Sequence, residues 1–223
     1  MRKIALAARR YAHTRRVAPK TVLKSMVLIC AGAACATTFP AQADDDFALR
    51  SPDLHRREFL DSRFIAHGLG CLGKNISPRL EWKSPPPGTR SFALLLHDPD
   101  APNGSGLWHW ALYNIPAETR TLPRGAGNEH SQLPNGSLRG KNDFDESWVT
   151  SGDGYFGPCP PVGHGPHRYI FTLYALAVPN LHKATGLSPQ SSPALHAYML
   201  NYGLGNKVLA KAHYVVTYHR PPS

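Results

Sequence analysis

Apolar residues in this chain come in short runs that glycine and proline separate. The longest runs lie at 91–97, 108–115, 168–178 and 213–218, and a shorter one lies at 80–82. They are rich in aromatic and β-branched residues, and their lengths suit strands better than long amphipathic helices. The pattern therefore predicts a mainly β fold, a β-sandwich with minor helices.

One late segment has helical spacing instead. Ser192 and Pro193 provide an N-cap and a first-turn proline, and apolar residues follow three and four apart up to Tyr202. Gly203 and Gly205 should end or kink this helix. We expect it to resume over 204–212, before the closing strand.

Residues 119–154 show little periodicity and are rich in Gly, Pro, Asn and Ser. We interpret them as long surface loops with one or two short strands, for example around Trp148. Loops of this length in a compact domain are often functional.

The first 43 residues have the pattern of a secretion signal. A basic segment precedes an apolar run over 26–36, and Ala41-Gln42-Ala43 forms an A-x-A cleavage pattern. The apolar run is short for a membrane span. We therefore expect cleavage after Ala43, a single domain over 44–223, no integral membrane span after cleavage, and a periplasmic or secreted protein. An uncleaved anchor is the alternative.

Most of the net positive charge of the chain lies in this leader. The whole chain carries a formal charge of +10, but eight of its 25 Lys and Arg residues lie within 1–43, which contain no acids. The remainder has 17 basic and 15 acidic residues. The sequence after the leader shows no basic stripe interleaved with aromatic residues, so it gives no support for a nucleic-acid partner.

Two cysteines remain beyond the leader, Cys71 and Cys159. An even pair in an oxidising compartment suggests a disulfide. Two free thiols are the alternative, and a metal pair has less support because neither cysteine stands in a Cys-x-x-Cys spacing.

The candidate functional residues lie in two segments whose backbone is restricted by prolines, here called proline-locked segments. Asp98-Pro99-Asp100-Ala101-Pro102 follows one apolar run, and a loop with four prolines and three glycines over 157–166 leads into His167, Arg168 and Tyr169. Prolines and glycines fix such loops, and His and Tyr can donate to phosphate oxygens while Asp accepts from an ammonium group. The segments predict a rigid polar pocket for a zwitterionic or anionic small ligand.

These segments carry a family resemblance. The Asp-Pro-Asp-Ala-Pro block, the Trp108-His109-Trp110 strand and the Gly-Pro-Cys-Pro-Pro…Pro-His-Arg-Tyr block resemble the signature regions of the phosphatidylethanolamine-binding protein family, in particular its bacterial Raf-kinase-inhibitor-like branch. The resemblance runs over about 69–218. It implies a large central antiparallel sheet packed on a smaller sheet, with one or two C-terminal helices.

The resemblance also implies a set of site residues. Six positions match the family's anion pocket: Asp98, His109, Pro160, Pro161, His167 and Tyr169. Asp100 and Arg168 match positions of structural support. Cys159 is a departure, because eukaryotic members typically have Gly there, and a disulfide to Cys71 would alter the pocket's shape. No metal or other cofactor is expected.

The function that we expect is therefore binding of a phosphate-bearing or other anionic head group by an exported protein that is not an enzyme. It could also modulate a protein partner, and a homodimer is left open. One alternative is a hydrolytic or metal-dependent enzyme that uses Asp98, His109 and His167. Another is an interaction module that acts through loops 119–154. Five other histidines stand in surface-like sequence contexts: His55, His67, His130, His182 and His196.

Overall fold

The structure is a computed structural model that describes residues 46–144 and 153–220. The expected secretion signal, its cleavage site and the expected strand around Trp148 lie outside these residues. All of the described residues belong to one compact unit of the chain.

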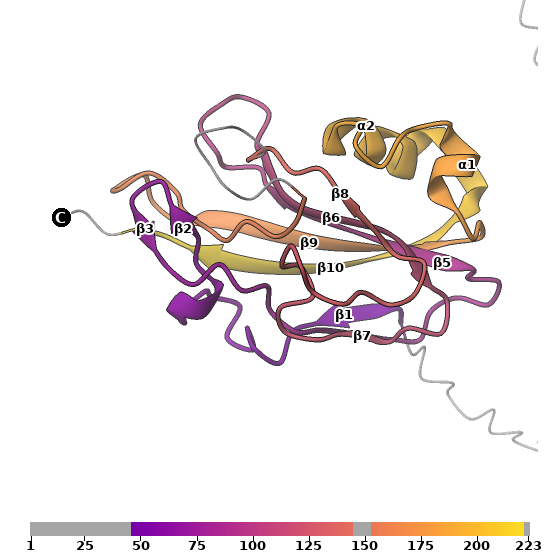
Figure 1. Cartoon of the computed structure of the whole chain (residues 1–223), viewed down its shortest axis with the longest axis horizontal. Coiled ribbons are helices and arrows are strands. Elements are labelled where there is room, and N and C mark those ends of the chain that lie inside the picture. The colour runs from indigo at the N-terminus through magenta and orange to yellow at the C-terminus, as the bar shows by residue number, and fades with distance from the viewer. Residues whose placement is uncertain (1–45, 145–152, 221–223) are drawn as a thin grey trace, which may run out of the picture. The chain divides into compact units, whose positions relative to one another are not determined.

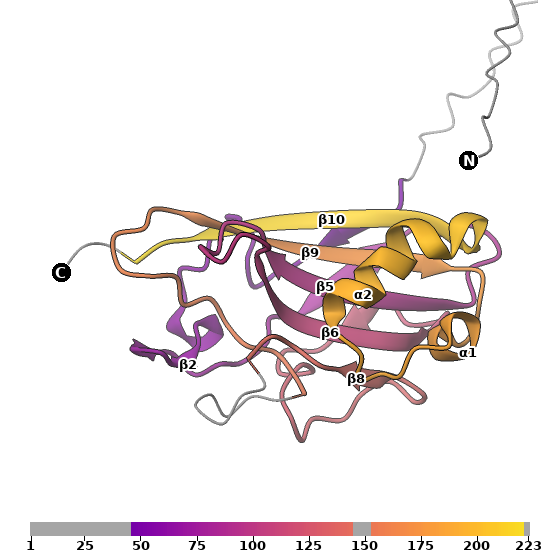
Figure 2. The same ribbon diagram turned by 90° about the horizontal axis from the view of Figure 1, so that it is seen from above.

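The main layer is a five-stranded antiparallel sheet in the order β10-β9-β5-β6-β8. Figure 2 shows this order from β10 at one edge to β8 at the other. Three strands are long and almost entirely buried, so they form the centre of the sheet. The bounds are β5 (Ser91–Asp98), β6 (Leu107–Pro116), β8 (Leu138–Gly140), β9 (His167–Leu176) and β10 (Val208–Tyr218).

A smaller sheet packs on one face of the main sheet (Figure 1). Its order is β1-β4-β7, with bounds β1 (Ala48–Arg50), β4 (Leu80–Lys83) and β7 (Thr121–Leu122). Alternate residues of β5, Phe92, Leu94 and Leu96, are fully buried in the core that includes Trp82 of β4. This alternation is that of a sandwich strand, and the predicted large sheet on a smaller sheet is confirmed.

A 3₁₀ turn at Ser62–Phe64 is followed along the chain by a two-stranded antiparallel hairpin, β2 (His67–Gly68) and β3 (Cys71–Leu72). Its residue Cys71 is buried and Leu72 is exposed.

Two short helices, α1 (Leu181–Thr185) and α2 (Pro193–Tyr198), cover the other face of the main sheet (Figure 1). The Ser192 side chain accepts from Leu195 N, and Pro193 lies in the first turn, as predicted. A wider turn at Met199–Gly203 continues α2 and ends at Gly203. Together these elements bury Leu95 and Tyr113 of the sheet in a second core.

The expected helical continuation over 204–212 is wrong. A single 3₁₀ turn, Gly205–Lys207, leads into β10, which starts at Val208 and pairs with β9 along its whole length. Leu, Ala and Lys in this segment are good helix formers, but pairing with a buried central strand outweighs such weak local preferences.

Candidate functional site

The predicted site residues lie where three strands of the main sheet meet. Asp98 is the last residue of β5, and His109 and His167 lie at the starts of β6 and β9. Because β5 runs antiparallel to both neighbours, its end lies beside their beginnings. The fold therefore brings the two proline-locked segments to one end of the sheet.

Asp98 and His167 form a buried pair. His167 Nδ1 lies 2.7 Å from Asp98 Oδ2 and donates to it. Asp98 is 2 % exposed and His167 is 1 % exposed. The other carboxylate oxygen accepts from the backbone N–H of Asp100 at 2.9 Å. Asp98 thus fixes the ring of His167 and leaves only its Nε2 for further contacts.

His109 lies beside Asp98 and His167, and its Nε2 carries an unshared electron pair. Its Nδ1 donates to the carbonyl of Phe156 at 2.8 Å, which leaves Nε2 as an acceptor. Nε2 is buried and has no hydrogen-bond partner among the described residues. Burial lowers the pKa of His109 from 6.5 to about 4, against a smaller opposing effect of the Phe156 carbonyl, so the ring is neutral near pH 7.

Tyr169 completes the cluster with a hydroxyl. Its ring lies edge-on to His109 at 5.2 Å, and the residue is fully buried. In residues 46–144 and 153–220 its hydroxyl also has no partner of hydrogen-bond geometry. Burial, then the charge of Asp98 and a hydrogen-bond interaction with its carboxylate, raise the pKa of this phenol, so that it keeps its hydrogen.

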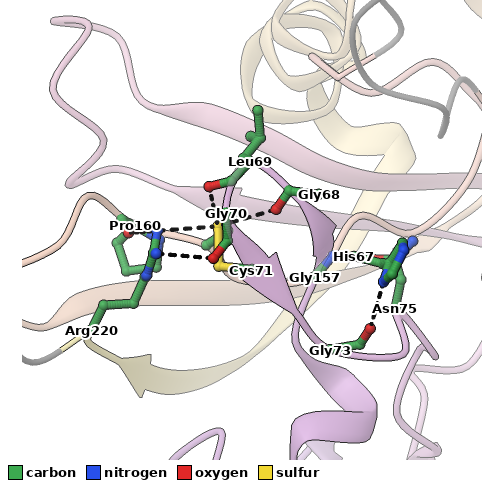
Figure 3. The surroundings of a disulfide bond; sticks show 11 residues. His67, Gly68, Leu69, Gly70, Cys71, Gly73, Asn75, Gly157, Pro160 and Arg220 are labelled. Atoms are coloured by element: carbon green, nitrogen blue, oxygen red, sulfur yellow. Dashed lines mark hydrogen bonds between the residues drawn. A yellow bond between two sulfur atoms is a disulfide. The ribbon is translucent and has the colours of Figure 1, made fainter. Parts of the chain in front are cut away.

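The loop that precedes His167 is held by a disulfide. Cys71 of β3 is bonded to Cys159, as predicted, with the two Cα atoms 6.0 Å apart. Figure 3 shows the bond beside Arg220, whose guanidinium donates to the carbonyls of Gly70 at 3.1 Å and Pro160 at 3.4 Å. These ties fix the hairpin and the loop against the end of the main sheet.

Asn75 and Gly157 hold the same loop from its other side (Figure 3). Gly157 N donates to Asn75 Oδ1 at 2.7 Å. A Cβ at Gly157 would lie 2.4 Å from the carbonyl oxygen of Phe64, so no other residue fits there without backbone movement. The close approach explains a glycine at the entry to the loop.

The remaining predicted residues differ in their surroundings. Pro160 is buried in the loop, whereas Pro161 is exposed. The exposed Arg168 and the half-buried Asp100 form an ion pair at 2.7 Å, and Arg168 N also donates to Asp100 Oδ2 at 2.8 Å. This pair joins the two segments at the surface, outside the buried cluster.

Sequence reasoning missed His164. Its Nδ1 lies 2.8 Å from His167 Nε2, so one of these nitrogens donates to the other. His164 itself is exposed. The only sequence signal was its position three residues before His167 in the glycine-rich loop.

Two of the histidines that the sequence places in surface-like contexts are not at the surface. His196 is fully buried and stacks on Tyr113 at 4.3 Å, and His182 is half-buried against the same ring. His182 belongs to α1 and His196 to α2, on the opposite face of the sheet from Asp98. Among the described residues no group of three or more His, Cys, Asp or Glu side chains is placed to hold a metal ion.

Comparisons with known proteins agree with this architecture. A model of the phosphatidylethanolamine-binding protein family matches residues 55–219. The chain is 41 % identical to the UPF0098 protein YbcL of Escherichia coli over 82 % of this chain and 91 % of that protein. It is 36 % identical to "Putative lipoprotein LppC" of Mycobacterium tuberculosis over 63 % of this chain and 61 % of that protein.

Solved structures give the same result. The crystal structure of E. coli YbcL superposes with a TM-score of 0.67 and 39 % identity, covering 78 % of this chain and 98 % of that one. The phosphatidylethanolamine-binding protein homolog CT736 from Chlamydia trachomatis superposes with a TM-score of 0.53 and 26 % identity, covering 78 % and 97 %. With the family model matched across both signature segments, this chain belongs to the phosphatidylethanolamine-binding protein family.

Proposed function

We propose that this protein is an exported small-ligand-binding protein whose buried cluster takes a phosphate-bearing or other anionic head group. The observation that carries the proposal is the set Asp98, His109, His167 and Tyr169, in which two buried polar atoms have no partner in the described part of the chain. Buried polar groups in proteins are almost always paired, so unpaired ones mark a place for a ligand or water.

Export rests on separate observations. The leader has the pattern of a secretion signal, the fold contains a disulfide, and a relative is named as a lipoprotein. In the described part of the chain no helix is long and apolar enough to cross a membrane. A periplasmic or secreted protein fits these features. Modulation of a protein partner and self-association remain further options for the same fold.

The enzyme alternative has one observation in its favour. Asp98 and His167 are paired as a carboxylate and a base would be in acid–base catalysis. However, the partner that the structure gives to His167 Nε2 is His164, not a Ser or Cys nucleophile. We therefore propose binding without chemistry. Turnover of a phosphate ester that stops in a His167→Gln variant would refute this part.

Two tyrosine variants test the binding site. Among the described residues the Tyr169 hydroxyl has no partner of full hydrogen-bond geometry. We therefore expect Tyr169→Phe to weaken calorimetric binding of phosphate or phosphoethanolamine by about tenfold, with little change in stability. Tyr155→Phe is the matched control, since the Tyr155 hydroxyl donates to the carbonyl of Phe64 at 2.7 Å. It should lose about 1 kcal/mol of stability and keep its ligand affinity. The reverse result would place the site elsewhere.

A further inference from the structure

The outer face of the small sheet is hollowed. A cavity of about 530 Å³ lies over β1, β4 and β7. A second cavity of about 510 Å³ adjoins it, because Arg79 and Thr121 line both. Together the two cavities form one elongated groove, whose lining includes none of the residues of the cluster around Asp98 and His167.

Most of the charged side chains that line this groove are positive, and we call it the basic groove. Five of its lining residues are basic and one, Glu81, is acidic. The basic residues are Arg50, Arg79, Lys83, Arg120 and Arg124. The chain after residue 43 has 17 basic and 15 acidic residues, so the groove carries a larger positive excess than that whole part of the chain. Such a concentration of one sign of charge attracts an anionic partner.

Strand alternation places the charges of β4 on the outside of the sheet. Leu80 and Trp82 are buried in the core, so Glu81 and Lys83 face outward. Trp82 N donates to the carbonyl of Arg120 at 3.0 Å, which places Arg120 beside the Lys83 end of the strand. Arg79, which lies before the strand, marks the other end.

Contacts within the sheet hold the guanidinium groups in position. Arg50 and Arg79 each bind the Glu81 carboxylate at 2.7 Å, one on each oxygen, so two cations share one anion. Arg120 donates to two backbone carbonyls of its own loop, at 2.7 Å and 2.8 Å, and both of these acceptors are neutral. The guanidinium groups are therefore positioned in advance, and their positive charge exceeds that of their acceptors.

The length of the groove favours an extended chain over a single anionic group. Arg79 and Lys83 are four residues apart along one strand, which separates their backbone positions by about 13 Å. Acidic side chains at alternate positions of an extended peptide repeat at about 7 Å, so three of them span this distance. Glu81, between the two, can accept from peptide N–H groups, whereas it repels the phosphates of a nucleic acid or a lipid surface.

We propose that the basic groove binds an extended acidic segment of a partner protein. Carboxylates of that segment pair with Lys83 and Arg120 at one end of the groove and with Arg79 and Arg124 at the other. The interaction is separate from the ligand-binding cluster, with which the groove shares no residue.

Fluorescence anisotropy with a labelled peptide of alternating Glu and Thr, about eight residues long, tests this proposal, since β-branched Thr favours an extended chain. At low ionic strength the protein should bind this peptide and should not bind a Gln-Thr peptide of the same length. Lys83→Gln should weaken binding roughly two- to fivefold, and the double variant with Arg120→Gln about tenfold. Lys183→Gln, at an exposed lysine of α1 on the other face of the main sheet (Figure 1), is the matched control and should leave the affinity unchanged.

Three results would overturn the proposal. Equal losses in Lys83→Gln and Lys183→Gln would mean that only the net charge of the protein matters. Tighter binding of a thymidine oligonucleotide or of phosphatidylglycerol vesicles, lost in the same groove variants, would assign the groove to phosphates. No binding of the Glu-Thr peptide by the wild type would refute the proposal directly. The proposed function is tested separately, because phosphate binding at Asp98 and His167 should be the same in Lys83→Gln and the wild type.

Discussion

Asp98 and Asp100 both accept hydrogen bonds on each carboxylate oxygen, but only Asp98 is buried. The donors to Asp98 are Nδ1 of the buried His167 and the backbone N–H of Asp100, which is half-buried. Asp100 instead pairs with Arg168 at the surface, and that guanidinium holds the pKa of Asp100 down to about 2. The proline-locked sequence is similar around both residues, but burial gives them different energetic weight.

This difference predicts the cost of two substitutions. In Asp98→Asn one oxygen becomes an amide N–H₂, so either His167 Nδ1 or the backbone N–H of Asp100 loses its acceptor. We expect a loss of about 2–3 kcal/mol in urea unfolding. Arg168→Ala breaks only an exposed ion pair and should cost under about 1 kcal/mol. Similar losses in both variants would mean that the Asp98 pair contributes no more than the surface pair.

At the scale of elements, local sequence signals were sufficient to predict the helix and strands that capping residues or prolines delimit. Ser192 and Pro193 predicted the start of α2, and the proline-bounded apolar runs predicted β5, β6 and β9. The sequence also contains signals for α1. Asn180 caps its first turn, and Gly186, with φ +75°, ends it.

The elements that could not be predicted depend on tertiary contacts. The segment from Val208 is a strand only because β9 pairs with it, and nothing local to its sequence excludes a helix. The same limit applied to side chains. Resemblance brought His109 and His167 into the candidate site, but the contact of His164 with His167 and the burial of His196 follow from packing.

The disulfide gives a prediction at this scale. Cys71 and Cys159 are 88 residues apart, and closing so long a loop in the unfolded chain contributes about 4–5 kcal/mol in the chain-entropy model, with measured values often lower. The double variant Cys71→Ser and Cys159→Ser should lose roughly 2–4 kcal/mol in urea unfolding. Reduced wild-type protein is the control and should unfold like the variant. An unchanged midpoint in the double variant would contradict the prediction.

For the whole molecule, buried neutral histidines set the response to acid. His109 has its pKa lowered to about 4, and burial also lowers the pKa values of His182 and His196. The unfolded chain therefore binds protons below pH 6.5 that the native state does not bind. Stability should fall as the pH drops from about 6.5 to about 4, with a contribution from His109 of up to about 3 kcal/mol.

His109→Gln removes one of these groups and tests the sign. Its free energy of unfolding should decrease less steeply than that of the wild type between pH 6.5 and 4, in urea titrations at several pH values. His55→Gln, at an exposed position, should keep the wild-type slope. Parallel curves for His109→Gln and the wild type would show that protonation of His109 is not coupled to unfolding.

The strand order of the main sheet also determines when the molecule can finish folding. β10 ends at Tyr218, which pairs with His167 at the start of β9, and β10 contributes Tyr214 and Val216 to the main core. A chain still being synthesised lacks this strand until residue 218 has emerged, so β9 stays without this neighbour and the end of the sheet that holds His167 stays incomplete. The main sheet therefore cannot reach its full set of strand pairings before β10 is available.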